Sequence, residues 1–274
     1  MNEAEANLRD VLLYATEKML RADEVGLLLS GGTDSMTVLW CLQFFGVRVQ
    51  AYTFYLEGHV SKDVVAARLA SETYGVPLTE IEIPYQATGA LAYDVAQLVH
   101  DMGSARKTAV ECTWPFIHVT PFVVEEQMFT GISADDLYGS AAHMQINYGK
   151  NPSAFRAKRA EQMADERTGG WCYVRDLFSR NAIELCAPYR DELVIDWFLD
   201  RSFAELHTPK QKGVALKAFE KEYAKTKMYR RQSNLQVGSG IREYMARMLD
   251  DPEVNPKGRK WLRGDQGGLY GDWV

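Results

Sequence analysis

Six consecutive residues near the start of the chain carry groups suited to binding a phosphate: Ser30, Gly31, Gly32, Thr33, Asp34 and Ser35. Two adjacent glycines let successive backbone N–H groups converge on one anion, and a following helix N-terminus adds partial positive charge. The hydroxyls of Ser30 and Ser35 can donate hydrogen bonds to phosphate oxygens. Asp34 would repel a bare phosphate, so its carboxylate indicates a bridging Mg²⁺. The chain has no Gly-x-x-x-x-Gly-Lys-Ser/Thr pattern, which excludes the phosphate loop of kinases and GTPases.

A second group of small and acidic residues spans Gly131–Gly139, with the sequence Gly-Ile-Ser-Ala-Asp-Asp-Leu-Tyr-Gly. It follows the apolar segment 126–130, which we expect to be a buried strand. The paired carboxylates Asp135 and Asp136 then enter a helix. Acidic residues in a first helical turn are also typical of plain charge stabilisation. Taken alone, this pattern is compatible with either a ligand site or an ordinary helix start.

Both groups resemble motifs of one enzyme family. Residues 30–35 match without a gap the Ser-Gly-Gly-x-Asp-Ser signature of ATP pyrophosphatases, which cleave ATP between its α and β phosphates and activate a substrate as an adenylate. Residues 131–139 are similar to the Gly-x-Gly-x-Asp-Glu-x-Phe-Gly motif of asparagine synthetases and β-lactam-forming relatives. The resemblance implies that residues 30–35 and Gly131 bind ATP. It also implies that Asp34 and Asp135 hold the Mg²⁺ that bridges the β and γ phosphates.

Three further segments resemble the same family more loosely. Residues 188–191 (Pro-Tyr-Arg-Asp) are similar to a Pro-Phe-Leu-Asp segment near the bound substrate, which implies a substrate contact for Asp191. Residues 212–219 resemble a Lys-x-x-Leu-Arg-x-x-Phe helix. Residues 230–240 resemble an Arg-x-Lys segment followed by glycines.

The chain departs from the family pattern at residues expected to act after adenylation, where the nucleophile attacks; we call these residues the acceptor half of the site. Ile132 stands where asparagine synthetases have a glutamate that serves proton transfer, and an apolar side chain cannot do this. Ser233 stands in place of the family's catalytic lysine, so we expect Lys227 and Arg231 to supply the missing cationic charge. The sequence begins Met1-Asn2, without the catalytic cysteine and glutaminase domain of glutamine-dependent relatives. We therefore expect free ammonia, an amine or a separate glutaminase to provide the nitrogen.

The elements that position these residues alternate along the chain. We expect strands at 25–29, 47–54, 78–83 and 126–130, and helices at 4–20, 35–45, 61–74 and 94–102. This alternation indicates βαβ units and a parallel sheet, with ligands at the carboxyl ends of its strands. The strand end at Phe54 is a candidate adenine contact. From residue 141 onward we expect helices and no strand.

The predicted fold class is therefore α/β, a parallel sheet with helices on both faces followed by a mainly helical C-terminal lobe. The resemblance implies an adenine nucleotide α-hydrolase-like core. We place that core at residues 1–145 and the helical lobe, which completes the substrate site, at residues 146–274.

The composition is that of an ordinary globular enzyme. The 274 residues carry a net charge of −6 and are 46% hydrophobic. This charge argues against non-specific nucleic-acid binding. No apolar run reaches the ~18 residues that a membrane span requires. The four cysteines are widely spaced and the N-terminus is acidic, so we expect a reduced, cytoplasmic protein without a targeting sequence.

These observations predict an ATP-dependent, AMP-forming ligase that adenylates a small-molecule carboxylate and forms an amide with ammonia or an amine. Its cofactors would be ATP and Mg²⁺. One alternative is a nucleobase- or tRNA-modifying enzyme of the same superfamily. Against it, the cysteine-rich zinc site of one such group is missing from the sequence. Another alternative is a catalytically degenerate ATP-binding module, which Ile132 and Ser233 favour.

Overall fold

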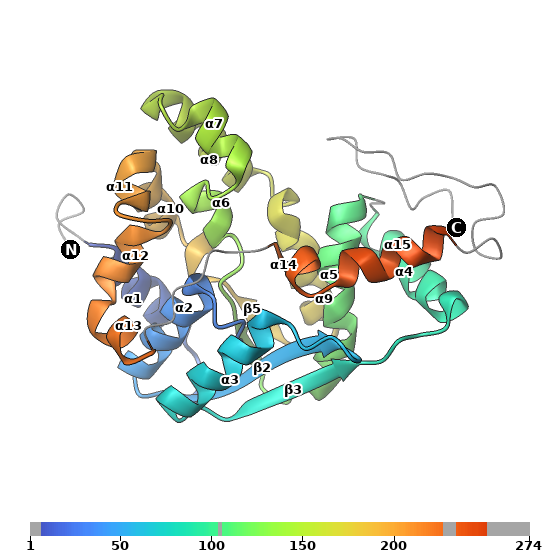
Figure 1. Ribbon diagram of the computed structural model, residues 1–274. Coiled ribbons are helices and arrows are strands. Elements are labelled where there is room, and N and C mark those ends of the chain that lie inside the picture. Colours follow the sequence, from blue (N-terminus) through green and yellow to red (C-terminus); the bar gives the residue numbers. More distant parts are fainter. Residues whose placement is uncertain (1–6, 104–105, 227–233, 251–274) are drawn as a thin grey trace.

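The alternating strands and helices form one parallel sheet with helices packed on both of its faces (Figure 1). The computed structural model describes residues 7–103, 106–226 and 234–250. The strands are β1 (Glu24–Leu28), β2 (Arg48–Leu56), β3 (Leu78–Ile83), β4 (Gln127–Phe129) and β5 (Glu184–Cys186). The helices up to β5 are α1 (Leu8–Met19), α2 (Thr33–Phe44), α3 (Lys62–Tyr74), α4 (Thr88–Met102), α5 (Lys107–Val119), α6 (Ala134–Tyr138), α7 (Ala142–Tyr148), α8 (Pro152–Ala164) and α9 (Trp171–Arg180). Those after it are α10 (Glu192–Leu199), α11 (Phe203–His207), α12 (Gly213–Ala218), α13 (Glu220–Thr226), α14 (Leu235–Gly238) and α15 (Ile241–Asp250). Short 3₁₀ helices are η1 (Thr120–Phe122), η2 (Thr168–Gly170) and η3 (Pro188–Arg190).

The direction in which strands are added to the sheet reverses between β1 and β4. All neighbouring strands are parallel, in the order β3-β2-β1-β4-β5. The chain adds β2 and β3 on one side of β1 and then crosses to add β4 and β5 on the other. β1 and β4 are therefore neighbours, with Leu27 opposite Phe129. In open parallel sheets, ligands bind at the carboxyl ends of the strands where the order reverses. The loops that carry Asp34 and Asp135 leave the sheet at this point.

Two hydrophobic clusters cover the two faces of the sheet. Successive side chains of a strand point to opposite faces, and in β4 Met128 belongs to one cluster and Phe129 to the other. Helices α1, α2, α3, α10 and α12 contribute to the cluster that contains Phe129. Helices α4, α5, α9 and α15 contribute to the cluster of Met128, and Figure 1 shows this second group together at the right of the view. The fold class predicted from the sequence is thus confirmed.

Local sequence signals explain several helix boundaries. The Ser61 hydroxyl accepts a hydrogen bond from the Val64 amide and caps α3, which ends at Gly75 in the left-handed conformation. In α1, Asn7 and Asp10 form a reciprocal capping box. Pro115 lies inside α5, which continues to Val119. Within the described ranges, no helix combines the length and the apolar character needed to cross a bilayer.

The structure corrects two expectations about the C-terminal half. A fifth strand, β5, pairs with β4, so the expectation of no strand after residue 141 was wrong. The sheet therefore includes residues on both sides of the domain boundary predicted at residue 145, and the boundary itself stays a prediction. The high charge of residues 155–166 predicts a solvated helix face. This segment forms most of α8, but Phe155, Arg159 and Met163 are buried.

Arg159 on α8 is enclosed completely by the protein. Its guanidinium donates hydrogen bonds to the carbonyl oxygens of Leu137 on α6 (2.9 Å), Phe198 on α10 (2.8 Å) and Arg201 (2.7 Å). Burial lowers the pKa of Arg159 to about 10. The side chain thereby ties α8 to the ends of α6 and α10, and α6 is the helix that begins with the second acidic motif.

Candidate functional site

The loop after β1 is closed on itself by two serine hydroxyls. The Ser30 amide donates to Ser35 Oγ (3.2 Å), and the two hydroxyl oxygens lie 3.2 Å apart. Ser35 Oγ also donates to the Gly32 carbonyl (3.2 Å), and the Gly32 amide donates to Ser30 Oγ (3.3 Å). Helix α2 begins at Thr33, and its N-cap residue, Gly32, has no side chain of its own to cap the first turn. The loop therefore presents hydroxyls and a helix N-terminus, which together suit an anion.

Close backbone approach explains two glycines of the site. Gly31 has a φ of +65°, and a Cβ atom there would lie 2.5 Å from the Ala66 Cβ on α3. A Cβ atom on Gly131 would lie 2.8 Å from the Asp34 carbonyl carbon and 2.9 Å from the Ser35 nitrogen. The loops after β1 and β4 therefore touch at Gly131, which only glycine permits.

The second motif forms the short helix α6 directly after this contact. Its N-cap residue, Ser133, adopts the left-handed conformation with a φ of 71°, and Asp135 and Asp136 lie in the first turn. Burial, together with the neighbouring Asp135 carboxylate, raises the pKa of Asp136 to about 6, while Arg190 opposes this shift. The two acidic side chains thus have different environments, although they are adjacent in sequence.

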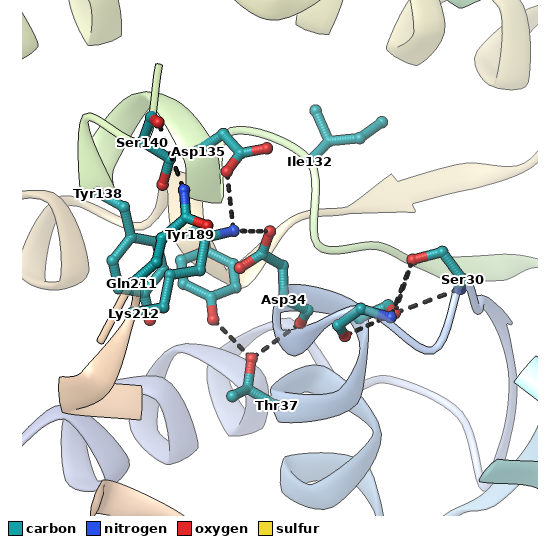
Figure 2. Close-up of polar contacts among 12 residues, drawn as sticks. Ser30, Asp34, Thr37, Ile132, Asp135, Tyr138, Ser140, Tyr189, Gln211 and Lys212 are labelled. Carbon is teal, nitrogen blue, oxygen red and sulfur yellow. Dashed lines mark hydrogen bonds and ion pairs between the residues drawn. The ribbon is translucent and has the colours of Figure 1, made fainter. Parts of the chain in front are cut away.

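Lys212 joins the two acidic loops (Figure 2). Its Nζ lies 2.5 Å from Asp34 Oδ2 and 2.8 Å from Asp135 Oδ1. The lysine side chain is 3% exposed, against 11% for Asp34 and 46% for Asp135. Burial disfavours the charged ammonium, but the charges of Asp135 and Asp34 outweigh it and raise the pKa of Lys212. A charged ammonium therefore stands at the carboxyl ends of β1 and β4.

The sequence did not single out Lys212 as a site residue. It was compared with the family only as the first residue of a loosely matching helix, and it lies far from either acidic motif in the sequence. In the structure it precedes α12 in the left-handed conformation, with a φ of 59°. The Tyr138 ring centre lies 5.1 Å from its Nζ. The sequence offered one indication, a lysine at the start of a segment that resembles the family. Its position beside Asp34 and Asp135 depends on the packing of α12 against the two loops, which the sequence does not show.

Buried hydroxyl groups support the Asp34 turn from below. The Thr37 hydroxyl donates to the Asp34 carbonyl oxygen (2.8 Å) and lies 2.5 Å from the Tyr189 hydroxyl (Figure 2). Burial raises the pKa of Tyr189 well above its ordinary value, and the nearby Asp34 charge adds to this effect. Tyr189 therefore stays neutral and serves as a fixed polar support.

Asp34 and Asp135 form a donor set that fits Mg²⁺. Mg²⁺ is commonly held by one or two carboxylates together with substrate phosphates and water. Within the described ranges, no cluster of three or more His, Cys, Asp or Glu side chains could hold a metal ion by itself. Two carboxylates beside a phosphate-binding loop match the first arrangement. The metal assignment of Asp34 and Asp135 stays a prediction that this geometry supports.

The other predicted site residues lie in varied places. Phe54 is inside β2, which continues to Leu56, and its ring packs edge-on against Phe116. The carboxylate of Asp191 caps α10 through the Leu193 amide and forms an ion pair with Lys18. These contacts give Asp191 a structural part, so its substrate contact, like the adenine contact at Phe54, stays a prediction.

Three positions bear on the acceptor half of the site. Ile132, in place of the family's glutamate, lies apart from the ion pairs of Lys212 in Figure 2 and packs partly into the cluster of Met128. Lys227 and Arg231, predicted as substitute cations, and Ser233 lie outside the described residues. Among the residues that the structure describes, Lys212 is the cation that pairs with the two carboxylates.

A separate cavity of about 330 Å³ lies between α4, α5 and α9. Its lining includes Arg106, Cys172 and Arg180, and it shares no residue with the two loops. The Arg180 guanidinium is engaged by the Asp101 carboxylate at 2.7 Å. This cavity is therefore distinct from the candidate site.

Two solved structures are similar to this chain over most of their length. One is an NMN synthetase from Francisella tularensis, with 12% identity, coverage of 97% of this chain and 99% of that chain, and a TM-score of 0.37. The other is a predicted subunit of a tRNA methyltransferase from Methanocaldococcus jannaschii, with 11% identity, coverage of 78% and 94%, and a TM-score of 0.36. At these scores, neither indicates what this chain acts on.

No curated protein sequence matches the chain significantly. The model of the asparagine synthase family matches residues 7–248, a range that contains both acidic loops and Lys212. The chain therefore belongs to the asparagine synthase family, whose members are ATP-dependent enzymes with the ATP pyrophosphatase fold.

Proposed function

We propose that this protein is an AMP-forming ligase that joins a small-molecule carboxylate to ammonia or an amine. The substrate carboxylate attacks the α phosphorus of ATP, the α–β phosphoanhydride bond breaks, and pyrophosphate leaves. The nitrogen nucleophile then attacks the acyl carbon of the adenylate, AMP leaves, and the nitrogen gives up a proton as the amide forms. The observation that carries this proposal is the position of the Lys212 ammonium between Asp34 and Asp135, beside the serine-glycine loop.

The described residues suit the first step, because that step gathers negative charge on the leaving pyrophosphate. The amides at the start of α2 and the hydroxyls of Ser30 and Ser35 lie in one loop, which supports their proposed binding of phosphate oxygens. The Lys212 ammonium adds a fixed positive charge where the two loops meet. When bound by Asp34 and Asp135, Mg²⁺ would supply further neutralisation of phosphate charge.

The second step is where this chain differs from asparagine synthetases. Ile132 offers no proton acceptor, so the nucleophile's proton must go to another group or to water. We therefore propose a substrate other than aspartate, with ammonia, an amine or a separate glutaminase as the source of nitrogen. The four cysteines are free in the structure, which supports a reducing, cytoplasmic setting for this reaction.

The replacement of the family's glutamate by Ile132 also supports a second candidate function, that of a protein that binds ATP without cleaving it. This candidate retains the loop geometry and lacks an acceptor half. It differs from the ligase in one measurable property, the formation of AMP.

Chromatography of nucleotides after incubation with ATP, Mg²⁺ and a metabolite extract tests the proposal. We expect AMP and pyrophosphate in equal amounts, and their loss in Asp34→Asn and Asp135→Asn. Asp200→Asn is the matched control, since Asp200 forms an exposed pair with Arg156 on the surface. Formation of ADP and phosphate would contradict the proposal. Intact ATP despite measured ATP binding would favour the second candidate.

A further inference from the structure

His207 connects the two elements that carry Asp135 and Lys212. Its Nε2 lies 2.8 Å from the carbonyl oxygen of Tyr138, the last residue of α6. The backbone N–H of Lys212 donates to its Nδ1 at 3.0 Å. One imidazole ring therefore contacts the end of the helix that begins near Asp135 and also the backbone of the lysine that pairs with it.

These two contacts determine the protonation of the ring. A carbonyl oxygen can only accept a hydrogen bond, so Nε2 must carry a proton and donate it. A backbone N–H can only donate, so Nδ1 must present its lone pair. Only the neutral imidazole with its proton on Nε2 makes both hydrogen bonds. The Phe203 ring, with its centre 4.2 Å from that of His207, packs against the imidazole from the same helix.

The backbone of Lys212 needs such support. A φ of 59° is unfavourable for a residue that has a Cβ atom. The bond from Lys212 N–H to His207 helps to hold this conformation, and the conformation sets the direction in which the side chain leaves the backbone. The ammonium at the end of that side chain is the group that meets Asp34 and Asp135.

We propose that His207 is a positioning residue of the ATP site, whose neutral imidazole holds the Lys212 backbone so that the ammonium stands between Asp34 and Asp135. His207 itself touches neither carboxylate in the described contacts. It acts on the site through Lys212 and through the end of α6. This inference rests on the proposed function only in that Lys212 is taken to bind phosphate.

Burial and two nearby cations keep His207 neutral near neutral pH. Burial lowers its pKa, the Tyr138 carbonyl opposes this, and the cationic Lys212 and Arg159 lower it further. Asp135 is the acidic group that acts on it from α6, and Glu205 on its own helix is held by Ser202. Protonation of Nδ1 would remove the acceptor of the Lys212 N–H and so release the backbone that directs the ammonium. Phosphate binding should therefore weaken in acid as His207 becomes protonated.

Two substitutions separate the two hydrogen bonds. In His207→Asn, the side-chain oxygen can take the place of Nδ1 and accept from the Lys212 N–H. In His207→Gln, the longer side chain can donate to the Tyr138 carbonyl but leaves the Lys212 N–H without that acceptor. His118→Asn is the matched control, because His118 is also mostly buried with a lowered pKa but lies on α5, a helix that contributes to the cluster of Met128.

Calorimetric binding of pyrophosphate and of ATP, each with Mg²⁺, measures the effect. We expect His207→Gln to weaken the binding of both ligands by about tenfold or more. This is the size of one charge-assisted contact, which the displaced Lys212 ammonium would lose with phosphate. His207→Asn should retain most of the affinity, and His118→Asn should bind like the unsubstituted protein. The loss of affinity in acid should be larger in the unsubstituted protein than in His207→Asn, because in the variant only the phosphates and groups other than His207 take up protons. If ATP is not cleaved but these differences hold, the proposed function fails while the positioning role stands.

Nitrogen-15 spectra of the imidazole in the unsubstituted protein give a test that needs no variant. We expect a protonated Nε2 and an unprotonated Nδ1 for His207 at neutral pH. The opposite tautomer would overturn the proposal. Equal phosphate affinity in His207→Gln and His118→Asn would also overturn it. So would equal losses of affinity in His207→Asn and His207→Gln, if those losses parallel the decrease in melting temperature.

Discussion

At the scale of single residues, Lys212 determines the charge balance of the site. One ammonium faces two carboxylates, and it is almost fully buried while Asp135 is half exposed. Removing one partner of a buried ion pair leaves an uncompensated charge, which costs more than the pair itself contributes. Lys212 thus contributes both to stability and to the proposed reaction, and the two contributions can be measured separately.

Lys212→Met should lower the rate of pyrophosphate formation by about 10²-fold or more, because a fixed cation is lost where charge develops. It should also lower the free energy of unfolding by about 2 kcal/mol or more, since Asp34 loses its buried partner. Kinetic assays and urea unfolding measure the two effects. Lys158→Met, which breaks a surface pair with Glu161, is the control and should change stability by less than about 1 kcal/mol. Unchanged turnover in Lys212→Met would remove the lysine from the mechanism.

Asp136 should make stability depend on pH in an unusual direction for a carboxylate. Its pKa in the folded protein is about 6, above the ordinary value of 3.8, because of burial and the adjacent Asp135. The folded state therefore binds the proton more tightly than the unfolded state, and the associated stability is lost as pH rises from about 4 through 6. Asp136→Asn should gain stability relative to the unsubstituted protein between pH 4 and pH 7, by at most about 3 kcal/mol. Urea unfolding at the two pH values measures this, and an equal difference at both would contradict the assignment.

At the scale of elements, the site depends on how closely the loops after β1 and β4 approach. Their strands are neighbours in the sheet, and the absent side chain of Gly131 lets the second loop touch Asp34. The relative position of Asp34 and Asp135 is therefore determined by backbone contact as well as by the ion pairs with Lys212.

Gly131→Ala tests this contact. The added Cβ would lie within 3 Å of the Asp34 backbone, so the loops must separate. We expect AMP formation and ATP affinity to fall by about tenfold or more, because small displacements of catalytic groups cost large factors in rate. Gly89→Ala is the control, since its Cβ would meet no atom within 4 Å and alanine favours the helix. Full activity in Gly131→Ala would show that the loops tolerate separation.

Arg159 belongs to the same scale, because it joins α8 to the ends of α6 and α10. Arg159→Met should lower the free energy of unfolding by about 3 kcal/mol or more, since several buried carbonyl oxygens lose a charged donor at once. Arg156→Met, on the same helix but in an exposed pair with Asp200, should cost less than about 1 kcal/mol. Urea unfolding of the two variants makes the comparison. Equal stability would mean that water replaces the guanidinium.

At the scale of the whole molecule, the sequence predicted those features that are local in the chain. Three strands follow from short apolar or alternating segments, the fourth is the short segment before the second acidic motif, and the loop after β1 follows from one unbroken motif. The structure confirms these four strands and this loop. β4 and β5 both have three residues, too few for a periodic pattern. β4 was expected as the segment that leads into the second acidic motif, whereas β5 became evident only from its pairing with β4. Arg159 lies in a charged segment, so its burial depends on carbonyl groups that come from distant helices.

The candidate site was predictable to a similar extent. Asp34 and Asp135 were found because each lies in a recognisable motif at a strand end. Lys212 is 178 residues from Asp34 along the chain, and their contact depends on where α12 packs. His207 has no sequence signal at all, because its role consists of two backbone contacts. Distances set by tertiary packing are therefore what the sequence analysis could not provide.

The Lys212 ammonium also acts as an internal counterion, and this has a thermodynamic consequence. A divalent ion that approaches the protein alone meets an ammonium already held between the two carboxylates, and two neighbouring cations repel one another. The phosphates of ATP offer the ammonium other anions, so nucleotide and metal should each tighten the binding of the other. We expect Mg²⁺ to raise the melting temperature only when ATP is present, and a chelator to leave the protein alone unchanged. The protein would then be insensitive to fluctuations in free Mg²⁺ until the nucleotide arrives.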